Sequence, residues 1–188
     1  YVPGVEHRLL VVGNRLVAAT RGETASVVGD GKSTIVELID SQINSDPRCG
    51  EDEFSPIEPV HVEREPAVLL ELQRQGFAPD SVPSVGKKVL IIRYGNLADD
   101  VTDEVHPDVA EAATLSARVV GLDIAGIDIV AEDISRPLEE QRGAIVEVNA
   151  GPGLLMHLKP AKGKPRPVGQ AIVDSLFGGY AVADAGQH

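Results

Sequence analysis

Apolar residues along the chain follow two spacings, one typical of strands and the other typical of helices. Residues 7–12 and 16–20 are nearly continuous apolar runs on either side of Gly13-Asn14, which predicts two strands joined by a tight turn. In residues 33–43, isoleucine and leucine recur at helical spacing, and a Ser-Thr pair can cap the start of the helix. The same reasoning predicts further strands over 87–92, 124–130 and 144–148, and further helices over 66–75, 106–121 and 168–177.

These elements are mixed without the regular strand–helix alternation that parallel sheets require. We therefore expect an α+β fold with a mostly antiparallel sheet flanked by helices. Residues 44–59 are predicted to form a loop, and residues 151–167 are rich in glycine, proline and lysine. Residues 178–188 lack periodicity and are expected to fray. One domain over residues 1–177, followed by a short tail, accounts for the pattern.

Composition and charge narrow the class of protein. Hydrophobic residues make up 43% of the chain and charged residues 24%, as in soluble globular proteins, and no apolar run approaches the ~20 residues of a membrane helix. The formal net charge of −12 disfavours nucleic-acid binding, which needs a basic face. Cys49 is the only cysteine, so an internal disulfide is impossible. No signal peptide or initiator methionine is visible, so we expect a cytoplasmic chain that begins inside a longer reading frame.

Glu147 and Asn149 are the first candidates for chemistry. They are two positions apart near the end of a predicted strand, so both side chains point to the same face while Val148 points into the core. A carboxylate beside an amide carbonyl offers the hard oxygen ligands that suit Mg²⁺. A sharp turn, Gly151-Pro152-Gly153, follows, and its backbone N–H groups can approach an anion closely. Pairing of the two last strands would bring Asp128 beside Glu147, and two such carboxylates repel each other unless a cation lies between them.

Other interpretations of these and neighbouring residues stay open at this point. A Glu-x-Asn pattern on a strand is most often a solvated face with no further role. Gly31-Lys32-Ser33 suggests a phosphate-binding loop, but that motif needs a glycine where Ser26 stands. His7, His61 and His106 show no metal-ligand spacing and are expected at the surface or at helix caps.

The run from Val146 to Gly153 resembles the closing signature of ATP-grasp enzymes, and Gly126-Ile127-Asp128 resembles the strand that precedes it. The first eight residues resemble the hinge that holds adenine in that family. Residues 29–34, 44–48, 100–107 and 149–177 narrow the resemblance to the ATP-grasp region of cyanophycin synthetases, more narrowly the C-terminal half of that fold. The resemblance covers nearly the whole chain, with a family-specific insertion over about residues 22–86.

This resemblance implies ATP and Mg²⁺ as cofactors and assigns roles to twelve residues. The family phosphorylates the C-terminal carboxylate of a poly-aspartate primer, and the amine of an incoming aspartate attacks the acyl phosphate; a separate region attaches arginine. The implied metal ligands are Asp128, Glu147 and Asn149; the implied nucleotide contacts are Val2, Glu6, Arg8 and Val146; the implied catalytic groups are Arg21, Arg93 and Gly153; and Asn96 and His157 would meet the substrate. Arginine suits such work because its guanidinium binds carboxylate and phosphate with two parallel hydrogen bonds.

The chain also departs from the family pattern. It starts at the hinge, so the preceding subdomain with its phosphate-binding lysine and lid is not in this sequence, and we expect the isolated chain to be inactive. A short glycine-rich loop after Asn96-Leu97 is missing, and Glu53 stands where the family has a histidine. The alternatives are another peptide-forming ATP-grasp ligase, of glutamate-adding or glutathione type, and a non-catalytic module. The expected partners are aspartate, arginine and a cyanophycin primer, in a homo-oligomer, with no nucleic acid and no membrane.

Overall fold

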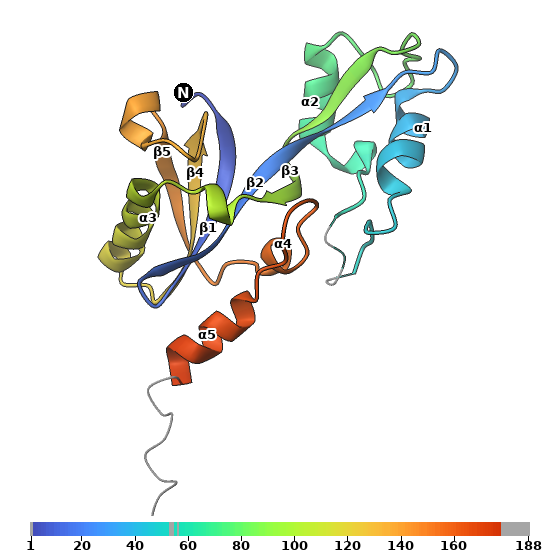
Figure 1. Cartoon of the computed structure of the whole chain (residues 1–188). Helices are drawn as coiled ribbons and strands as arrows, with labels where there is room; N and C mark the ends of the chain where they lie inside the picture. Colours follow the sequence, from blue (N-terminus) through green and yellow to red (C-terminus); the bar gives the residue numbers. More distant parts are fainter. Residues whose placement is uncertain (1, 53–54, 56, 178–188) are drawn as a thin grey trace, which may run out of the picture. The chain divides into compact units, whose positions relative to one another are not determined.

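The structure is a computed structural model that describes residues 2–52, 55 and 57–177, except for the side chains of residues 93–97 (Figure 1). The chain forms two compact units. The first combines the residues up to 21 with those from 100 onward, and the second contains residues 22–99. The tail that was expected to fray, residues 178–188, lies outside the described residues, as does Glu53.

Five strands are hydrogen-bonded in the order β3-β2-β1-β4-β5. Strand β1 is antiparallel to β2 and to β4, and β4 is antiparallel to β5. The predicted α+β class with a mostly antiparallel sheet is therefore confirmed. The strands are β1 (Val5–Val12), β2 (Arg15–Val28), β3 (Lys88–Asp100), β4 (Ile124–Ala131) and β5 (Ala144–Ala150).

Helix α3, Pro107–Val120, covers one face of the sheet in the first unit (Figure 1). It begins at His106, whose ring Nδ1 accepts a hydrogen bond from the Asp108 N–H at 3.2 Å, and it ends at Gly121, which has a φ of 82°. That left-handed conformation is one that glycine adopts readily. The buried face of the helix is small, with valine and two alanines at four-residue spacing, so the helix can pack closely on the apolar side chains of β1, β4 and β5.

The opposite face of the sheet carries a second, smaller apolar cluster. Leu10 and Val12 of β1 pack there with Val168, the first residue of α5 (Val168–Phe177). Side chains alternate along a strand, so Arg8 lies on this same face, two residues before Leu10. The face is thus apolar at one end of β1 and polar at the other, and the candidate site occupies the polar end.

The second unit has its own core, built from β2, β3 and two helices. Helix α1, Ile35–Ile39, starts with a capping box in which Thr34 and Glu37 bond to each other's backbone, and it continues as a π-helix over Asp40–Asn44. Helix α2, Pro66–Arg74, begins with proline, whose missing N–H costs nothing in the first turn. Apolar side chains from these helices bury against β2 and β3.

Several predicted boundaries were wrong. Strands β2 and β3 continue well past the predicted residues 20 and 92, to Val28 and Asp100. In the later half of β2, Ala25 and Val27 are both buried, and Val27 belongs to the second core. A short helix, α4 (Leu155–Leu158), forms in the segment rich in glycine, proline and lysine, where the sequence predicted none. Single turns of 3-10 helix lie at Val62–Arg64, Thr102–Glu104 and Leu138–Gln141.

No helix in the described part of the chain is long and apolar enough to cross a bilayer.

Candidate functional site

Three neighbouring strands of the first unit bring three charged residues to one level of the sheet. Arg8 of β1 pairs with Asp128 of β4, and Asp128 pairs with Glu147 of β5. Directly opposed residues in an antiparallel sheet project to the same face. The predicted meeting of Asp128 with Glu147 is confirmed, and Arg8 joins it from the other side.

A bulge in β5 sets the end of this row. Asp128 pairs with Glu147 while the next residue of β4, Ile129, pairs with Ile145, so Val146 is an extra residue with no partner in the register. Val146 is 53% exposed, whereas Val148 packs against the core. The bulge therefore lets Glu147 and Asn149 share the polar face while the predicted inward position of Val148 is kept.

Asp128 is the most buried member of the site, with its side chain 5% exposed. The Arg8 guanidinium donates from Nε to Oδ1 and, at 2.9 Å, from Nη2 to Oδ2, and Asn149 Nδ2 also donates to Oδ2 at 3.0 Å. Burial raises the pKa of Asp128 above its ordinary value because it disfavours the charged form; Arg8 opposes this shift, and the Glu147 carboxylate adds to it. The carboxylate thus depends on a nearby positive charge.

Gly126 and Pro152 lie next to the Arg8 side chain on this face of the sheet. A Cβ on Gly126 would lie 2.8 Å from Pro152 Cβ and 3.3 Å from Arg8 Cδ, so the missing side chain leaves room for both. The Gly-Pro-Gly turn after β5 consequently packs next to the Arg8 stem. Its first glycine, Gly151, has a φ of 68°. Apart from its two chain neighbours, no described residue has an atom within 4 Å of where a Cβ on Gly153 would lie.

His157 lies on α4, just after this turn. It is 1% exposed, and neither ring nitrogen has a hydrogen-bond partner among the described residues. Burial, reinforced by the charge of Arg8, lowers the pKa of His157 to about 4, while Asp100 opposes the shift. The ring is therefore neutral near pH 7. Its neighbour Met156 accepts a 3.5 Å contact from the Thr20 hydroxyl, and Thr20 is the residue of β2 opposite Arg8.

A network of ion pairs holds the segment after α4 in place. Arg166 donates from Nε and Nη2 to Asp100 at 2.6–3.1 Å and from Nη1 to Asp103 at 3.0 Å. The Arg166 backbone N–H donates to the His157 carbonyl at 2.8 Å. Sequence reasoning missed this network, because nothing in the local pattern links residues more than sixty positions apart.

The remaining predicted residues are not all brought to this face. Glu6 shares it, two positions along β1 from Arg8. Arg21 does not: it pairs with His7, whose side chain lies on the opposite face, toward α3. Val2 precedes the first strand and is half-buried. Arg93 and Asn96 lie on β3 in the second unit, and their side chains lie outside the described residues.

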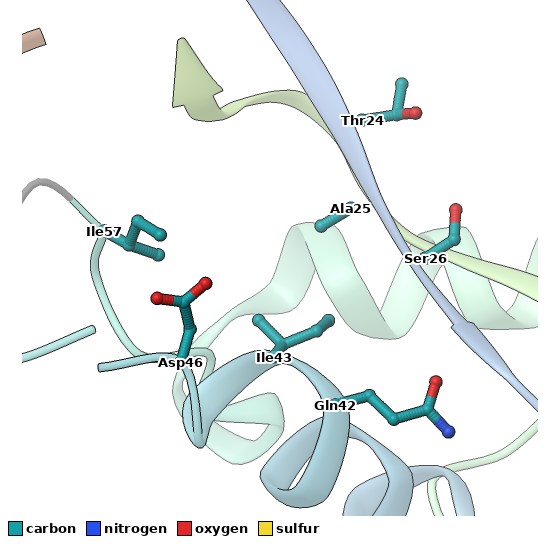
Figure 2. A pocket seen from close by; sticks show the side chains of 7 residues that line it. All are labelled: Thr24, Ala25, Ser26, Gln42, Ile43, Asp46 and Ile57. Atoms are coloured by element: carbon teal, nitrogen blue, oxygen red, sulfur yellow. The ribbon is translucent and has the colours of Figure 1, made fainter. Parts of the chain in front are cut away.

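The second unit contains a separate hollow of about 180 Å³ beside β2 and the π-helix (Figure 2). None of the predicted site residues is among its described lining. Its one carboxylate, Asp46, is held by the Arg48 side chain at 2.8 and 3.0 Å, and this pairing lowers the pKa of Asp46 to about 2. The lining residues are Thr24, Ala25, Ser26, Gln42, Ile43, Asp46 and Ile57.

Comparison with known proteins identifies the kind of enzyme to which this chain is related. It is 43% identical over 182 residues to cyanophycin synthetases from Trichormus variabilis and Synechocystis, a match that covers 94% of this chain and 20% of each relative. It is 34% identical over the same length to a glutathione biosynthesis bifunctional protein from Clostridium perfringens, 23% of which is covered. No family model matches the chain.

A solved structure gives the same result at the level of the fold. The bifunctional glutathione synthetase from Pasteurella multocida superposes with a TM-score of 0.70 at 27% identity, over 95% of this chain and 24% of that one. The chain is thus homologous to one segment of these ligases, and both the resemblance to cyanophycin synthetase and the ATP-grasp type of fold are confirmed. It spans about one fifth of the length of the cyanophycin synthetases it matches.

Proposed function

We propose that this chain is part of an ATP-dependent carboxylate–amine ligase of the cyanophycin synthetase type. In this reaction the C-terminal carboxylate of a poly-aspartate primer takes the γ-phosphoryl group of ATP and ADP leaves; the amine of an incoming aspartate then displaces phosphate and forms the amide. The observation that carries the proposal is the meeting of Arg8, Asp128 and Glu147 on one face of three strands, within a segment that is 43% identical to cyanophycin synthetases.

Asp128, Glu147 and Asn149 would hold the magnesium ion, and their chemistry fits it. Two carboxylates face each other across β4 and β5, and the raised pKa of Asp128 has the burial and the Glu147 charge among its causes. No group of three or more His, Cys, Asp or Glu side chains suited to a metal exists among the described residues, so this set depends on the Asn149 amide oxygen as its third ligand. When bound, magnesium would neutralise charge on the phosphoryl group in transfer.

The other residues of this face would bind and orient the reactants. Arg8 supplies a guanidinium that can bind a phosphate or a carboxylate with two hydrogen bonds. The Gly153 N–H, in the turn after the proposed metal ligands, is proposed to face the charge that develops on the acyl phosphate. Glu6 on the same face, with Val2 and Val146, is proposed to bind the nucleotide. The roles of Arg21, Arg93, Asn96 and His157 remain predictions.

The decisive experiment is substitution of the proposed metal ligands. We expect Glu147→Gln and Asn149→Ala each to abolish ATP turnover with the strand intact. The first removes the negative charge and one of the two carboxylate oxygens, and the second removes the amide oxygen. Turnover is measured with aspartate, arginine and a cyanophycin primer, in a hybrid in which this chain replaces the aligned segment of the Trichormus variabilis enzyme. Circular dichroism checks the fold, and Glu139→Gln, an exposed carboxylate on a 3-10 turn, serves as the control. Wild-type turnover in either ligand variant would refute the metal assignment.

A second candidate function is formation of glutathione. The 34% identity to the Clostridium perfringens protein and the TM-score of 0.70 to the Pasteurella multocida structure support it. The two functions share the metal site and differ in substrate, so product analysis separates them. Polymer growth with aspartate and arginine supports the first. Glutathione formed from its precursors, by a hybrid built on the Pasteurella multocida enzyme and not by the cyanophycin hybrid, would support the second.

A further inference from the structure

We infer that Arg8 and the divalent cation are alternative partners of Asp128, so that metal binding displaces the Arg8 guanidinium from the carboxylate. This inference rests on the proposed function, since it concerns the same metal site. It goes beyond that function because it gives the site two charge-balanced states, one in which Arg8 binds Asp128 and one in which it is free to bind an anionic reactant.

The hydrogen bonds show that Arg8 binds both oxygens of the Asp128 carboxylate. Its Nε and Nη2 engage the two oxygens of Asp128 separately, and Asn149 Nδ2 takes a further position on Oδ2. A carboxylate has about four lone-pair positions, so these donors leave little room for a metal. A dication and a guanidinium on one carboxylate would also repel each other at close range. The two cations therefore compete.

Charge balance explains why the Arg8 guanidinium binds the Asp128 carboxylate. Asp128 is 5% exposed and directly opposite Glu147, and a buried carboxylate beside a like charge is costly without a cation. In this structure Arg8 supplies the positive charge. A metal ion bound by Asp128, Glu147 and Asn149 would supply more, and the guanidinium would then be in excess.

The surroundings allow Arg8 to move. Its side chain is 26% exposed, so the guanidinium can turn toward solvent without crossing the core. Gly126 has no Cβ beneath the Arg8 stem, and Pro152 is the other occupant of that space. The freed group would stay on the polar face, where it can bind an anion with two hydrogen bonds. Metal binding would in this way prepare the site for an anionic substrate.

The test measures binding of Mn²⁺ to the 188-residue chain by electron paramagnetic resonance, which needs no turnover. We expect Arg8→Gln to tighten Mn²⁺ binding about tenfold or more, because the competing charge is gone. Arg8→Lys, which keeps a charge, should change it less. Arg15→Gln is the matched control: Arg15 is exposed on β2 and pairs with Val12, so it reports only the effect of one lost positive charge.

A second measurement covers the case in which Arg8→Gln does not fold. In the wild-type chain, the Arg8 Nε–H resonance is followed by ¹⁵N nuclear magnetic resonance during a Mg²⁺ titration, and Arg8→Lys identifies the peak. We expect the chemical shift of this peak to move away from its carboxylate-bound value as Mg²⁺ is added. The midpoint of the change should equal the Mg²⁺ concentration that displaces half of the bound Mn²⁺.

The outcomes separate the inference from the proposed function. If Mn²⁺ binds the wild type and Arg8→Gln equally, and the Nε–H peak does not move, the inference is overturned while the metal site stands. If no metal binds to the wild type or to Arg8→Gln, both fail. Tighter binding in Arg8→Gln that is lost again on adding Glu147→Gln supports both.

Discussion

Most buried polar groups in a folded protein are hydrogen-bonded, and His157 departs from this rule while several side-chain amides follow it. Four side-chain amides each bond both the N–H and the C=O of a residue at least eight positions away, as a neighbouring strand would. His157 has neither ring nitrogen satisfied among the described residues although it is 1% exposed. An unpaired buried polar group costs about 1–3 kcal/mol, so its place next to the site needs a reason. The amide pairs are Gln42 with Val28, Asn44 with Val60, Gln75 with Leu90 and Gln141 with Asp133.

This contrast predicts a pH dependence of stability. The pKa of His157 is about 4 in the folded chain, against 6.5 for an ordinary histidine, so the unfolded chain binds more protons as the pH falls through that range. Its contribution is fully present above about pH 6.5 and is lost as the pH falls toward 4, by about 3 kcal/mol at most. We expect the free energy of unfolding of His157→Leu, measured by urea denaturation at pH 7, 6 and 5, to fall less with pH than that of the wild type.

Two further histidines serve as references for that experiment. The pKa of His7 is also lowered by burial, so some loss will remain in His157→Leu. His61, whose side chain is 44% exposed, provides the control His61→Gln. If His157→Leu loses as much stability as the control between pH 7 and 5, the buried neutral ring is not the cause.

If His157 contacts the substrate, His157→Leu will also raise the KM of the hybrid enzyme.

At the scale of elements, the register of β1 with its neighbours decides the site. The sequence predicted Asp128 beside Glu147, because these strands follow each other and each carries one acidic residue among apolar ones. It also predicted Arg8 as a contact of the site but not as the partner of Asp128. That pairing depends on β1 lying next to β4 rather than at an edge. The same register puts Arg21 opposite His7, on the other face.

The network around Arg166 gives a prediction at this scale, since it fastens the segment after α4 to the end of β3. We expect Arg166→Gln to lower the free energy of unfolding by about 3 kcal/mol, because Asp100, whose side chain is 5% exposed, would lose its counter-charge. Urea denaturation at pH 7 measures the change. Lys164→Gln is the control: its side chain is 74% exposed and pairs with the exposed carboxylate of Asp103, so we expect little effect. Equal effects of the two substitutions would contradict the assigned role.

At the scale of the whole molecule, two units with separate cores make up the described chain. The proposed metal ligands all lie in the first unit, whereas Arg93 and Asn96 belong to the second. The chain corresponds to about one fifth of the cyanophycin synthetases it matches.

We accordingly expect the 188-residue chain to bind Mn²⁺ and yet to show no ATP turnover. The proposed metal ligands are within it, but the lysine and lid that the family resemblance implies are not in this sequence. A coupled assay of ADP release, with aspartate, arginine and primer, compares the chain with the hybrid enzyme at equal concentration. ADP release by the isolated chain that Glu147→Gln abolishes would show that this segment is sufficient for catalysis.

The sequence by itself determined most of the strands and helices, the shared face of Glu147 and Asn149, and the resemblance to ligases, because side-chain alternation and short motifs are properties of neighbouring residues. The tertiary structure alone decided that Arg8 binds Asp128, that Arg21 faces away, and that the buried His157 ring has no hydrogen-bond partner within the described part of the chain. Those facts depend on strand order and on which apolar faces pack together. Residues 120 positions apart meet only when the whole core of the unit has formed.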